Sequence, residues 1–427
     1  MKNICFYFEI HQPLRLRRYR FFEIGQDHYY FDDFQTEDRI RGMVEQAYLP
    51  AIRTIAEMIR SSNGKFKCSF SISGVAMEQL EQYAPEVIDG FRELAKTGSV
   101  EFLAEPYAHS LASVYNRSEF EQQVKLHSKK TEALFGKKPT TFRNSELIYS
   151  DEIGEIVSAL GFKTMLIEEV KYVMGWKSPN FVYNHSYIPK LKLLVRNNKL
   201  SDDIAFRFSD HSWSDFPLSA EKFIRWISEL PKSEPVVNLW MGFEAFGFYQ
   251  RAESGIFEFL KALPYHAMEQ GHSFALPSEI TKKFDSVDSL TSPYPNSWSG
   301  EKDLSVWNGN DLQQEALNKL YAVSERVHLC KDAPLKNDWL KLQTTDNFRY
   351  MSHFDAFGTH YTSPYEAFTN YMNVLADFLD RVDAQYPTTI ENEELNELLK
   401  TIISQENEIA TLEEELKKAR ARKKKEE

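Results

Sequence analysis

The chain has 427 residues, a formal net charge of −12, 14% aromatic residues and three cysteines. This length accommodates one barrel-sized domain and a smaller one, and the acidic balance argues against nucleic acid as the main partner. Cys5, Cys68 and Cys330 are odd in number and at no metal-like spacing, which argues against a disulfide framework.

The first residues lead almost directly into an apolar strand at 3–9, which a cluster of arginines between 15 and 20 follows. This apolar run is too short, and its flanks are wrong, for a secretory signal. No uninterrupted apolar stretch in the sequence is long enough to span a bilayer. We therefore expect a cytoplasmic protein with no membrane partner.

Short apolar strands alternate with amphipathic helical segments from residue 1 to about 285. This alternation predicts a parallel sheet closed or nearly closed into a barrel, with a doubly wound open sheet as the alternative. No glycine-rich phosphate fingerprint follows an early strand, so the pattern does not favour a dinucleotide-binding fold. The predicted strands are 3–9, 66–73, 99–104, 140–144, 164–168, 191–196, 204–209 and 235–241. The predicted helices between them include 39–60, 76–97, 118–135, 151–160 and 220–229.

The composition changes at about residue 286. Residues 286–299 are rich in Ser, Pro and Asp, which predicts a loop. Helical patterns without a clear strand follow at 311–330, 335–345 and 364–385. We therefore expect an α/β barrel domain at 1–285 and a helical domain at 286–388 packed on it.

Residues 389–427 form a third region, a helical tail with a seven-residue repeat. Apolar residues recur every seven residues at Leu395, Ile402, Ile409 and Leu416. The intermediate position of the repeat holds Leu398, Gln405 and Leu412. This spacing over about three heptads is typical of a coiled coil, although a single solvated helix of this length is the alternative. We expect a self-associating helix and, through it, a homo-oligomer.

Polar side chains stand at the ends of several predicted strands, where barrel enzymes place their chemistry. His11 follows the first strand, and Pro13 prevents that strand from continuing. A lone histidine in such a place is more often a loop or packing residue. Glu101, Glu105 and His109 lie at or beyond the third strand, where a buried carboxylate needs a partner or a function.

Two further strand ends deliver carboxylates. Arg143 and Glu146 follow the strand at 140–144, and Glu244 follows the strand at 235–241. An arginine close to Glu146 would hold its carboxyl ionised, as a nucleophile requires. A plain buried Arg–Glu ion pair explains the same pattern equally well. Two carboxyl groups facing each other across a sugar are the minimal apparatus for cleaving a glycosidic bond.

Several motifs in one order give the chain a resemblance to a known family. They are His-Gln-Pro at 11–13, the segments 101–109, 142–149 and 236–247, and the segment 342–351. Together they resemble the signature regions of glycoside hydrolase family 57, in particular its α-amylase branch, and the similarity runs from about residue 3 to about residue 380. The resemblance implies an incomplete seven-stranded (β/α) barrel followed by a helical domain. It also implies retaining action on α-glucans, without a catalytic metal or cofactor.

The resemblance assigns roles to individual positions. Glu146 matches the nucleophile of the family. The regions that line the family's substrate cleft supply the expected substrate-binding residues, which are His11, Glu101, Glu105, His109, Arg143, Trp240, Glu244 and Asp346.

The chain departs from the family's pattern at the second catalytic carboxylate. The family motif reads Met-Asp-Tyr-Glu-Thr-Phe-Gly, whereas residues 241–247 read Met-Gly-Phe-Glu-Ala-Phe-Gly. Gly242 therefore stands where the family has its general acid/base, a group that contributes about 10²–10⁴ in rate. Asn347 replaces a histidine of the amylase pattern, and Pro106 and Ala108 replace Thr and Tyr.

We therefore expect a protein that acts on or binds α-glucans, with impaired hydrolysis. One alternative is an active α-amylase or 4-α-glucanotransferase that uses Glu244 or a water as acid/base. On an extended strand the side chain of Glu244 faces the same way as position 242, about 6.5–7 Å further along. A protein that binds α-glucan without cleaving it is another alternative. A metal-dependent polysaccharide deacetylase would need paired His and Asp ligands at helix-turn spacing, which the sequence does not show.

Overall fold

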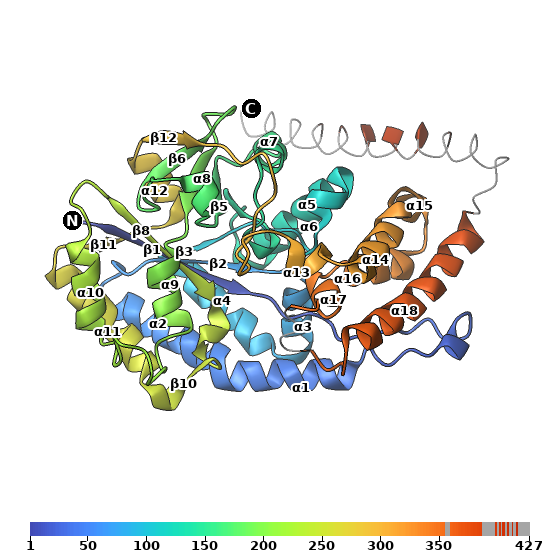
Figure 1. The fold of residues 1–427 in the computed structure, drawn as a ribbon, viewed down its shortest axis with the longest axis horizontal. Coiled ribbons are helices and arrows are strands. Elements are labelled where there is room, and N and C mark those ends of the chain that lie inside the picture. The colour runs from blue at the N-terminus through green and yellow to red at the C-terminus, as the bar shows by residue number, and fades with distance from the viewer. Residues whose placement is uncertain are drawn as a thin grey trace, which may run out of the picture.

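The computed structural model describes residues 1–354 and 359–386, with a few further positions between 398 and 416. Short strands alternate with helices along most of this length (Figure 1). The strands are β1 (Asn3–Ile10), β2 (Cys68–Ile72), β3 (Val100–Phe102), β4 (Thr141–Arg143), β5 (Thr164–Ile167), β6 (Val182–His185), β7 (Lys192–Val195), β8 (Val236–Gly242), β9 (Phe246–Gly247), β10 (Gln250–Arg251), β11 (Ser273–Phe274) and β12 (Asp288–Leu290).

The helices of the first 285 residues are α1 (Asp33–Met43), α2 (Leu49–Ser61), α3 (Gly74–Tyr83), α4 (Pro85–Lys96), α5 (Ala112–Tyr115), α6 (Arg117–Phe135), α7 (Asp151–Ala159), α8 (Lys171–Met174), α9 (Asn198–Ala205), α10 (Ala220–Glu229), α11 (Ile256–Glu269) and α12 (Pro277–Lys283). Later helices are α13 (Ser305–Asn308), α14 (Asp311–Ala322), α15 (Ser324–Leu329), α16 (Ala333–Leu342), α17 (Thr345–Arg349) and α18 (Pro364–Gln385).

The parallel strands follow one another around an incomplete barrel. One sheet contains β8, β1, β2 and β3, and the other contains β4, β5 and β7. A single bridge between Ala104 and Phe142 joins β3 to β4. Where β7 meets β8, the backbone N–H of Asn197 donates to the carbonyl of Asn238 over 2.9 Å. The sheets therefore meet at two points through isolated contacts, which confirms the predicted incomplete seven-stranded barrel.

Aromatic residues pack between the strands of one half of the barrel and the helices that cover them. β1 is buried along nearly its whole length, as a central strand with elements on both faces must be. The ring of Phe8 on β1 lies 5.4 Å from that of Phe70 on β2 and 5.6 Å from that of Phe243, which follows β8. Packing of these large rings fixes the relative positions of the strands whose ends carry the polar motifs.

The helices α13 to α18 pack on the barrel and lie to the right in Figure 1. One apolar cluster contains Phe142 and Met165 from the barrel together with Leu317, Leu342 and Phe378 from these helices. The shared core confirms the predicted arrangement of a barrel followed by a helical region. The domain limits at residues 285 and 388 stay predictions.

Two segments differ from the sequence prediction. Residues 204–209 are not a strand, because Ile204 and Ala205 end helix α9. The side chain of Asn197 accepts a hydrogen bond from the backbone N–H of Leu200, which starts this helix, and Leu200 and Ile204 bury its apolar face. Residues 286–299, predicted as a loop, contain β12, which pairs with β6. Three residues are too few for a visible alternating pattern.

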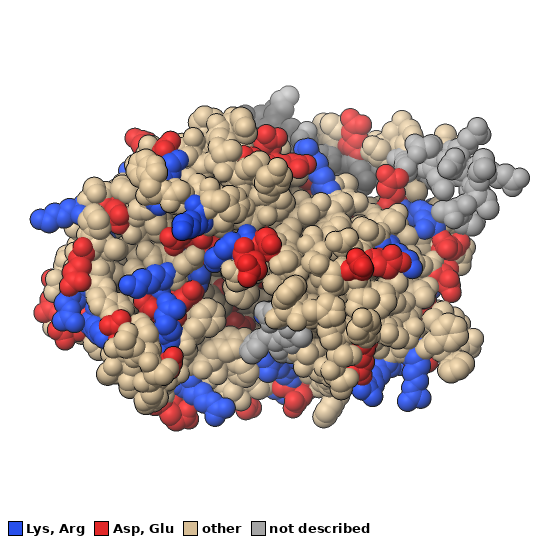
Figure 2. Space-filling model, viewed as in Figure 1, with Lys and Arg blue, Asp and Glu red and all other residues tan. Residues whose placement is uncertain are grey.

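The predicted tail at 389–427 lies almost entirely outside the described residues. The few described positions there, including Leu398, Ile402 and Ile409, are helical and exposed, and self-association stays a prediction. No helix in the described part of the chain is long and apolar enough to cross a membrane. On the face shown in Figure 2, acidic and basic side chains intermix without a large region of one sign.

Candidate active site

A cavity of about 560 Å³ opens at the carboxyl ends of β1, β4 and β8. Its lining includes Glu9, His11, Glu146, Gly242 and Asp346. Residues from the first strand and from the last helices therefore meet at the rim where a barrel enzyme places its chemistry.

Glu146 occupies a strained turn directly after β4. Its backbone lies in the left-handed region, with φ 53° and ψ 24°, and the next residue, Leu147, also has φ 53°. Asn144 holds this turn, because its amide donates to the carbonyl of Ile148 over 2.9 Å and its side-chain oxygen accepts from Ser145. Such conformations cost roughly 1–3 kcal/mol for residues other than glycine. Holding Glu146 in this conformation therefore lowers the stability of the fold, and it directs the carboxyl group of Glu146 into the cavity.

Three donors bind the carboxylate of Glu146. The indole N–H of Trp298 donates to Oε2 over 2.5 Å, the hydroxyl of Thr345 donates to Oε1 over 2.9 Å, and Nε2 of His109 lies 3.3 Å from Oε1. Burial opposes ionisation, but the hydrogen bond and charge of His109, followed by the bond from Trp298, hold the pKa of Glu146 well below its usual range. Glu146 is therefore a carboxylate at every physiological pH.

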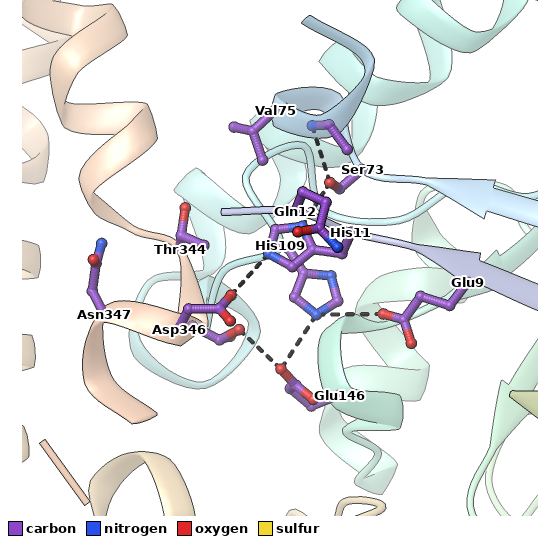
Figure 3. Close-up of polar contacts among 12 residues, drawn as sticks. Glu9, His11, Gln12, Ser73, Val75, His109, Glu146, Thr344, Asp346 and Asn347 are labelled. Atoms are coloured by element: carbon purple, nitrogen blue, oxygen red, sulfur yellow. Dashed lines mark hydrogen bonds and ion pairs between the residues drawn. The ribbon is translucent and has the colours of Figure 1, made fainter. Parts of the chain in front are cut away.

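His109 links three carboxylates. Its Nε2 contacts Glu146 and also lies 3.5 Å from Glu9 (Figure 3). Its Nδ1 lies 3.2 Å from Glu105. Burial would lower the pKa of His109, but the hydrogen bonds to Glu105 and Glu146 outweigh it and raise the pKa to about 10. The ring is therefore a buried imidazolium that donates from both nitrogens.

A second histidine stacks on the first. The rings of His11 and His109 lie 4.1 Å apart at 16°, and His11 bridges Ser73, at 2.7 Å, and Asp346, at 2.9 Å. The hydrogen bond and charge of His11 overcome burial and lower the pKa of Asp346. Asn347, at the position where the amylase pattern has histidine, donates instead to the carbonyl of Leu342 over 3.2 Å.

Arg143 does not contact Glu146 in the way the sequence suggested. Its guanidinium lies 2.7 Å from Glu9 and 3.5 Å from Glu105. The arginine lines the cavity but pairs with carboxylates beside the predicted nucleophile. The predicted Arg143–Glu146 ion pair, and the activating role that Arg143 would have had through it, are therefore wrong. His109, Trp298 and the charge of Arg349 keep Glu146 ionised instead.

The other predicted site residues separate into two groups. Trp240 and Glu244 line the cavity, whereas Glu105 lies fully buried behind His109. Glu101 is not in the cavity lining. Its carboxylate accepts from the hydroxyl of Thr141 over 2.5 Å and from the backbone N–H of Ser278 over 3.1 Å. The substrate-binding role predicted for Glu101 is therefore wrong for the pocket as the structure describes it, because this carboxylate caps the start of α12.

Position 242 faces the cavity without a side chain. Gly242 has φ −63° and ψ 142°, a conformation open to any residue. A Cβ there would lie 3.1 Å from Oε2 of Glu244. The other oxygen of Glu244 accepts hydrogen bonds from the hydroxyl of Tyr48 and, over 3.3 Å, from the amide of Gln12. The carboxyl group of Glu244 therefore lies next to the space that a side chain at position 242 would fill, and Tyr48 and Gln12 hold it there by hydrogen bonds.

The sequence reasoning missed two residues that the cavity brings to Glu146. Glu9 is the next-to-last residue of β1, and its place at the end of a buried strand was a signal that could have found it. Trp298 comes from the region predicted as a plain loop, and nothing in its composition pointed to the nucleophile.

Within the described residues, only one group of three side chains is arranged so that it could bind a metal ion. Oxygen and nitrogen atoms of Glu9, Glu105 and His109 lie within 4.8 Å of one another. The guanidinium of Arg143 already contacts both carboxylates, and the raised pKa of His109 places a second positive charge there. This donor set is already neutralised, and a metal ligand would have to be an unprotonated imidazole.

Two sequence comparisons match most of this chain. A sequence profile described as "Glycosyl hydrolase family 57" matches residues 5–293. A protein of Methanocaldococcus jannaschii named "Putative alpha-amylase" is 34% identical over 402 residues, which cover 88% of this chain and 84% of that protein.

Two solved structures share the fold. A GH57 branching enzyme from Thermococcus kodakaraensis gives a TM-score of 0.68 at 12% identity, over 93% of this chain and 94% of that one. A 4-alpha-glucanotransferase from Thermococcus litoralis gives 0.63 at 16% identity over 81% of this chain. The match spans 56% of the length of the glucanotransferase.

Proposed function

The protein belongs to glycosyl hydrolase family 57, and on that premise we propose that it acts on α-glucans by a retaining mechanism with Glu146 as nucleophile. We further propose that its turnover is slow, because no carboxylate stands at position 242. The names of the amylase-like, branching and glucanotransferase relatives support an α-glucan as substrate.

The environment of Glu146 is the observation that carries this proposal. A nucleophilic carboxylate must be ionised and aimed, and Glu146 has both three donors and a strained backbone that fixes its direction. A purely structural carboxylate would gain nothing from the left-handed turn.

Slow turnover follows from the bare position 242. The departing sugar oxygen needs a proton, and a positioned acid contributes about 10²–10⁴ in rate, or roughly 3–5 kcal/mol of barrier. The carbohydrate alkoxide is a poor leaving group, so the loss is felt most on natural glucans.

The walls of the cavity suit sugar rings. Phe206, Tyr249 and Trp298 line it, and their flat faces can stack on the C–H faces of glucose units. His11 and Asp346 supply polar groups for hydroxyls. A volume of about 560 Å³ is in the usual range for small-ligand sites.

Two substrates of different leaving group test the proposal. We expect an aryl α-maltoside with a dinitrophenol leaving group to be cleaved readily, and maltooligosaccharides to be cleaved slowly, when phenol release and reducing ends are followed. A fluorinated glycosyl fluoride should leave a sugar ester on Glu146, detectable by mass spectrometry of peptides. The absence of both phenol release and the ester would refute the proposal and favour glucan binding without cleavage.

A second candidate keeps efficient hydrolysis and gives the acid/base role to Glu244. It rests on the 3.1 Å between Oε2 of Glu244 and the Cβ position of residue 242. Turnover of maltooligosaccharides that is as fast as that of the aryl maltoside, and that is lost in Glu244→Gln, would support this candidate instead.

A further inference from the structure

The residue that pairs with the bare position 242 across the sheet is Glu9. β1 and β8 are parallel neighbours, and their register pairs Glu9 with Gly242. Paired residues of adjacent strands point to the same face, with strands about 4.8 Å apart. Glu9 lines the same cavity as Gly242, and its side chain keeps 23% of its surface accessible. Resting on the function proposed above, we propose that Glu9 transfers the proton in place of the missing carboxylate at position 242.

Glu9 is also placed in relation to the nucleophile. One nitrogen of His109 lies 3.5 Å from Oε1 of Glu9 and 3.3 Å from Oε1 of Glu146, and the two carboxylates approach it from different directions (Figure 3). The oxygens of Glu9 and Glu146 that contact this nitrogen can be no further apart than these two distances together. The separation of about 5–5.5 Å between the carboxyl groups of retaining pairs falls within that limit. The contacts to His109 are therefore compatible with the spacing of a retaining pair for Glu9 and Glu146.

The electrostatics of the pair fit an alternating acid and base. Burial raises the pKa of Glu9 against the opposing charges of Arg143 and His109, and the charge of Glu146 adds to the rise. When Glu146 becomes a sugar ester it loses that charge, so the pKa of Glu9 falls. The raised pKa therefore favours the protonated form of Glu9 before the ester forms, and the fall favours the ionised form, which can accept a proton, afterwards.

Glu244 lacks this relation. Its Oε1 is held by Tyr48 and Gln12, and burial raises its pKa with Arg39, rather than the nucleophile, among its charged neighbours. Among the described contacts, Glu244 shares no partner with Glu146. Its place over Gly242 suits a positioning residue that shapes the cavity wall.

The chemistry balances with these two carboxyl groups alone. In the first step Glu146 bonds to the anomeric carbon as the glycosidic C–O bond breaks, and the proton of Glu9 passes to the departing oxygen. In the second step a water or sugar hydroxyl bonds to the anomeric carbon and gives its proton to Glu9, and the bond to Glu146 breaks. Glu9 ends protonated and Glu146 ionised, as they began.

Glu9→Gln, measured beside Glu244→Gln and Glu101→Gln, tests the assignment. Glu101 is the matched control, a carboxylate on β3, which is separated from β1 by β2, and it lies outside the cavity lining. We expect Glu9→Gln to lose about 10²-fold or more on maltooligosaccharides, to release dinitrophenol in a first burst, and to lose the basic limb of the pH profile of kcat/KM. Azide should restore turnover of the dinitrophenyl maltoside by Glu9→Gln and yield the α-glycosyl azide, because Glu146 still forms the ester with this substrate.

Glu9→Asp keeps the test decisive if Glu9→Gln folds poorly, because it leaves a carboxylate for Arg143 beside Glu105. Gly242→Asp in the Glu9→Gln background should restore turnover of maltooligosaccharides, and Glu9→Asp should lose activity on them while keeping the dinitrophenyl substrate. Wild-type rates in Glu9→Gln, or azide rescue confined to Glu244→Gln, would overturn the assignment. A wild-type protein that neither releases dinitrophenol nor labels Glu146 would instead refute the proposed function itself.

Discussion

The two sides of the cavity differ sharply in how completely they are built. On the side of β4, Glu146 has three donors, a strained turn and a charged histidine behind it. On the side of β8, Gly242 offers no functional group, and the carboxylates nearest to it come from β1 and from the turn after β8.

This contrast shows which half of a retaining reaction the fold supports fully. Groups that ionise and aim the nucleophile all survive, so formation of the sugar ester needs no further residue when the leaving group is good. Proton transfer to a poor leaving group has no side chain at position 242 and depends on Glu9 from the neighbouring strand β1.

Removal of the nucleophile should have the largest effect. Glu146→Gln keeps the shape of the side chain but removes the attacking charge, and we expect a loss of roughly 10⁴-fold or more in kcat for the dinitrophenyl maltoside. Stopped-flow phenol release measures it. Phenol release at the wild-type rate in this variant would mean that another group attacks the sugar.

His109→Gln should weaken the well-built side next. Removing one partner of a buried charge cluster typically costs about 3–5 kcal/mol, and denaturant unfolding at neutral pH should show it. Because the pKa of His109 is raised from 6.5 to about 10, its stabilisation is complete below pH 6.5 and is lost as the pH rises through about 10.

The pH dependence of unfolding therefore gives this prediction its control. The wild type should lose stability between pH 6.5 and about 10, and His109→Gln should lose less across that window. In His127→Gln the decline should persist, because burial lowers the pKa of His127 and its effect has the opposite sign. Equal slopes in wild type and His109→Gln would show that His109 is not charged in the folded protein.

Gly242→Asp should restore a proton donor on the β8 side of the cavity. The backbone conformation accepts any residue, and the new Cβ would meet only the flexible end of Glu244 at 3.1 Å. We expect a gain of about 10²-fold in kcat on maltooligosaccharides. Gly242→Asn, which has a similar size but no proton to give, is the control and should gain little.

Phe206→Ala should have the smallest effect, on substrate binding alone. The ring is 56% exposed at the wall of the cavity, and loss of one stacking contact is worth about 0.5–1.5 kcal/mol, which is up to about tenfold in KM. Trp176→Ala, at a residue that is 92% exposed and outside the cavity lining, is the control. An unchanged KM in Phe206→Ala would exclude this wall from the glucan path.

Much of this molecule could be predicted from its sequence, and the exceptions have physical causes. Long apolar strands such as β1 and β8 carry their own signal, and the resemblance placed His11, His109, Glu146 and Asp346 in one cavity. The partner of Arg143 could not be foreseen, because residues a short distance apart in sequence can face different neighbours once a strand ends in a tight turn.

The roles of Glu9 and Glu101 show the same limit. Both are carboxylates on buried strands, but Glu9 lies at the end of β1 beside the cavity, whereas Glu101 lies within β3 and caps α12. Strand length and register decide between these outcomes, and β3 has only three residues. Trp298 reaches Glu146 from far along the chain through a fold that no local pattern encodes.

The leaving-group dependence of kcat/KM tests the contrast between the two sides most directly. It is measured with aryl α-maltosides whose phenols span a wide range of pKa, for the wild type and for Gly242→Asp. We predict a steep fall in rate with rising phenol pKa in the wild type, where Glu9 donates from the neighbouring strand, and a clearly shallower one in Gly242→Asp, where a carboxyl group at the position itself protonates the departing oxygen. Equal slopes in the two proteins would contradict the claim that proton transfer at position 242 is what this cavity lacks.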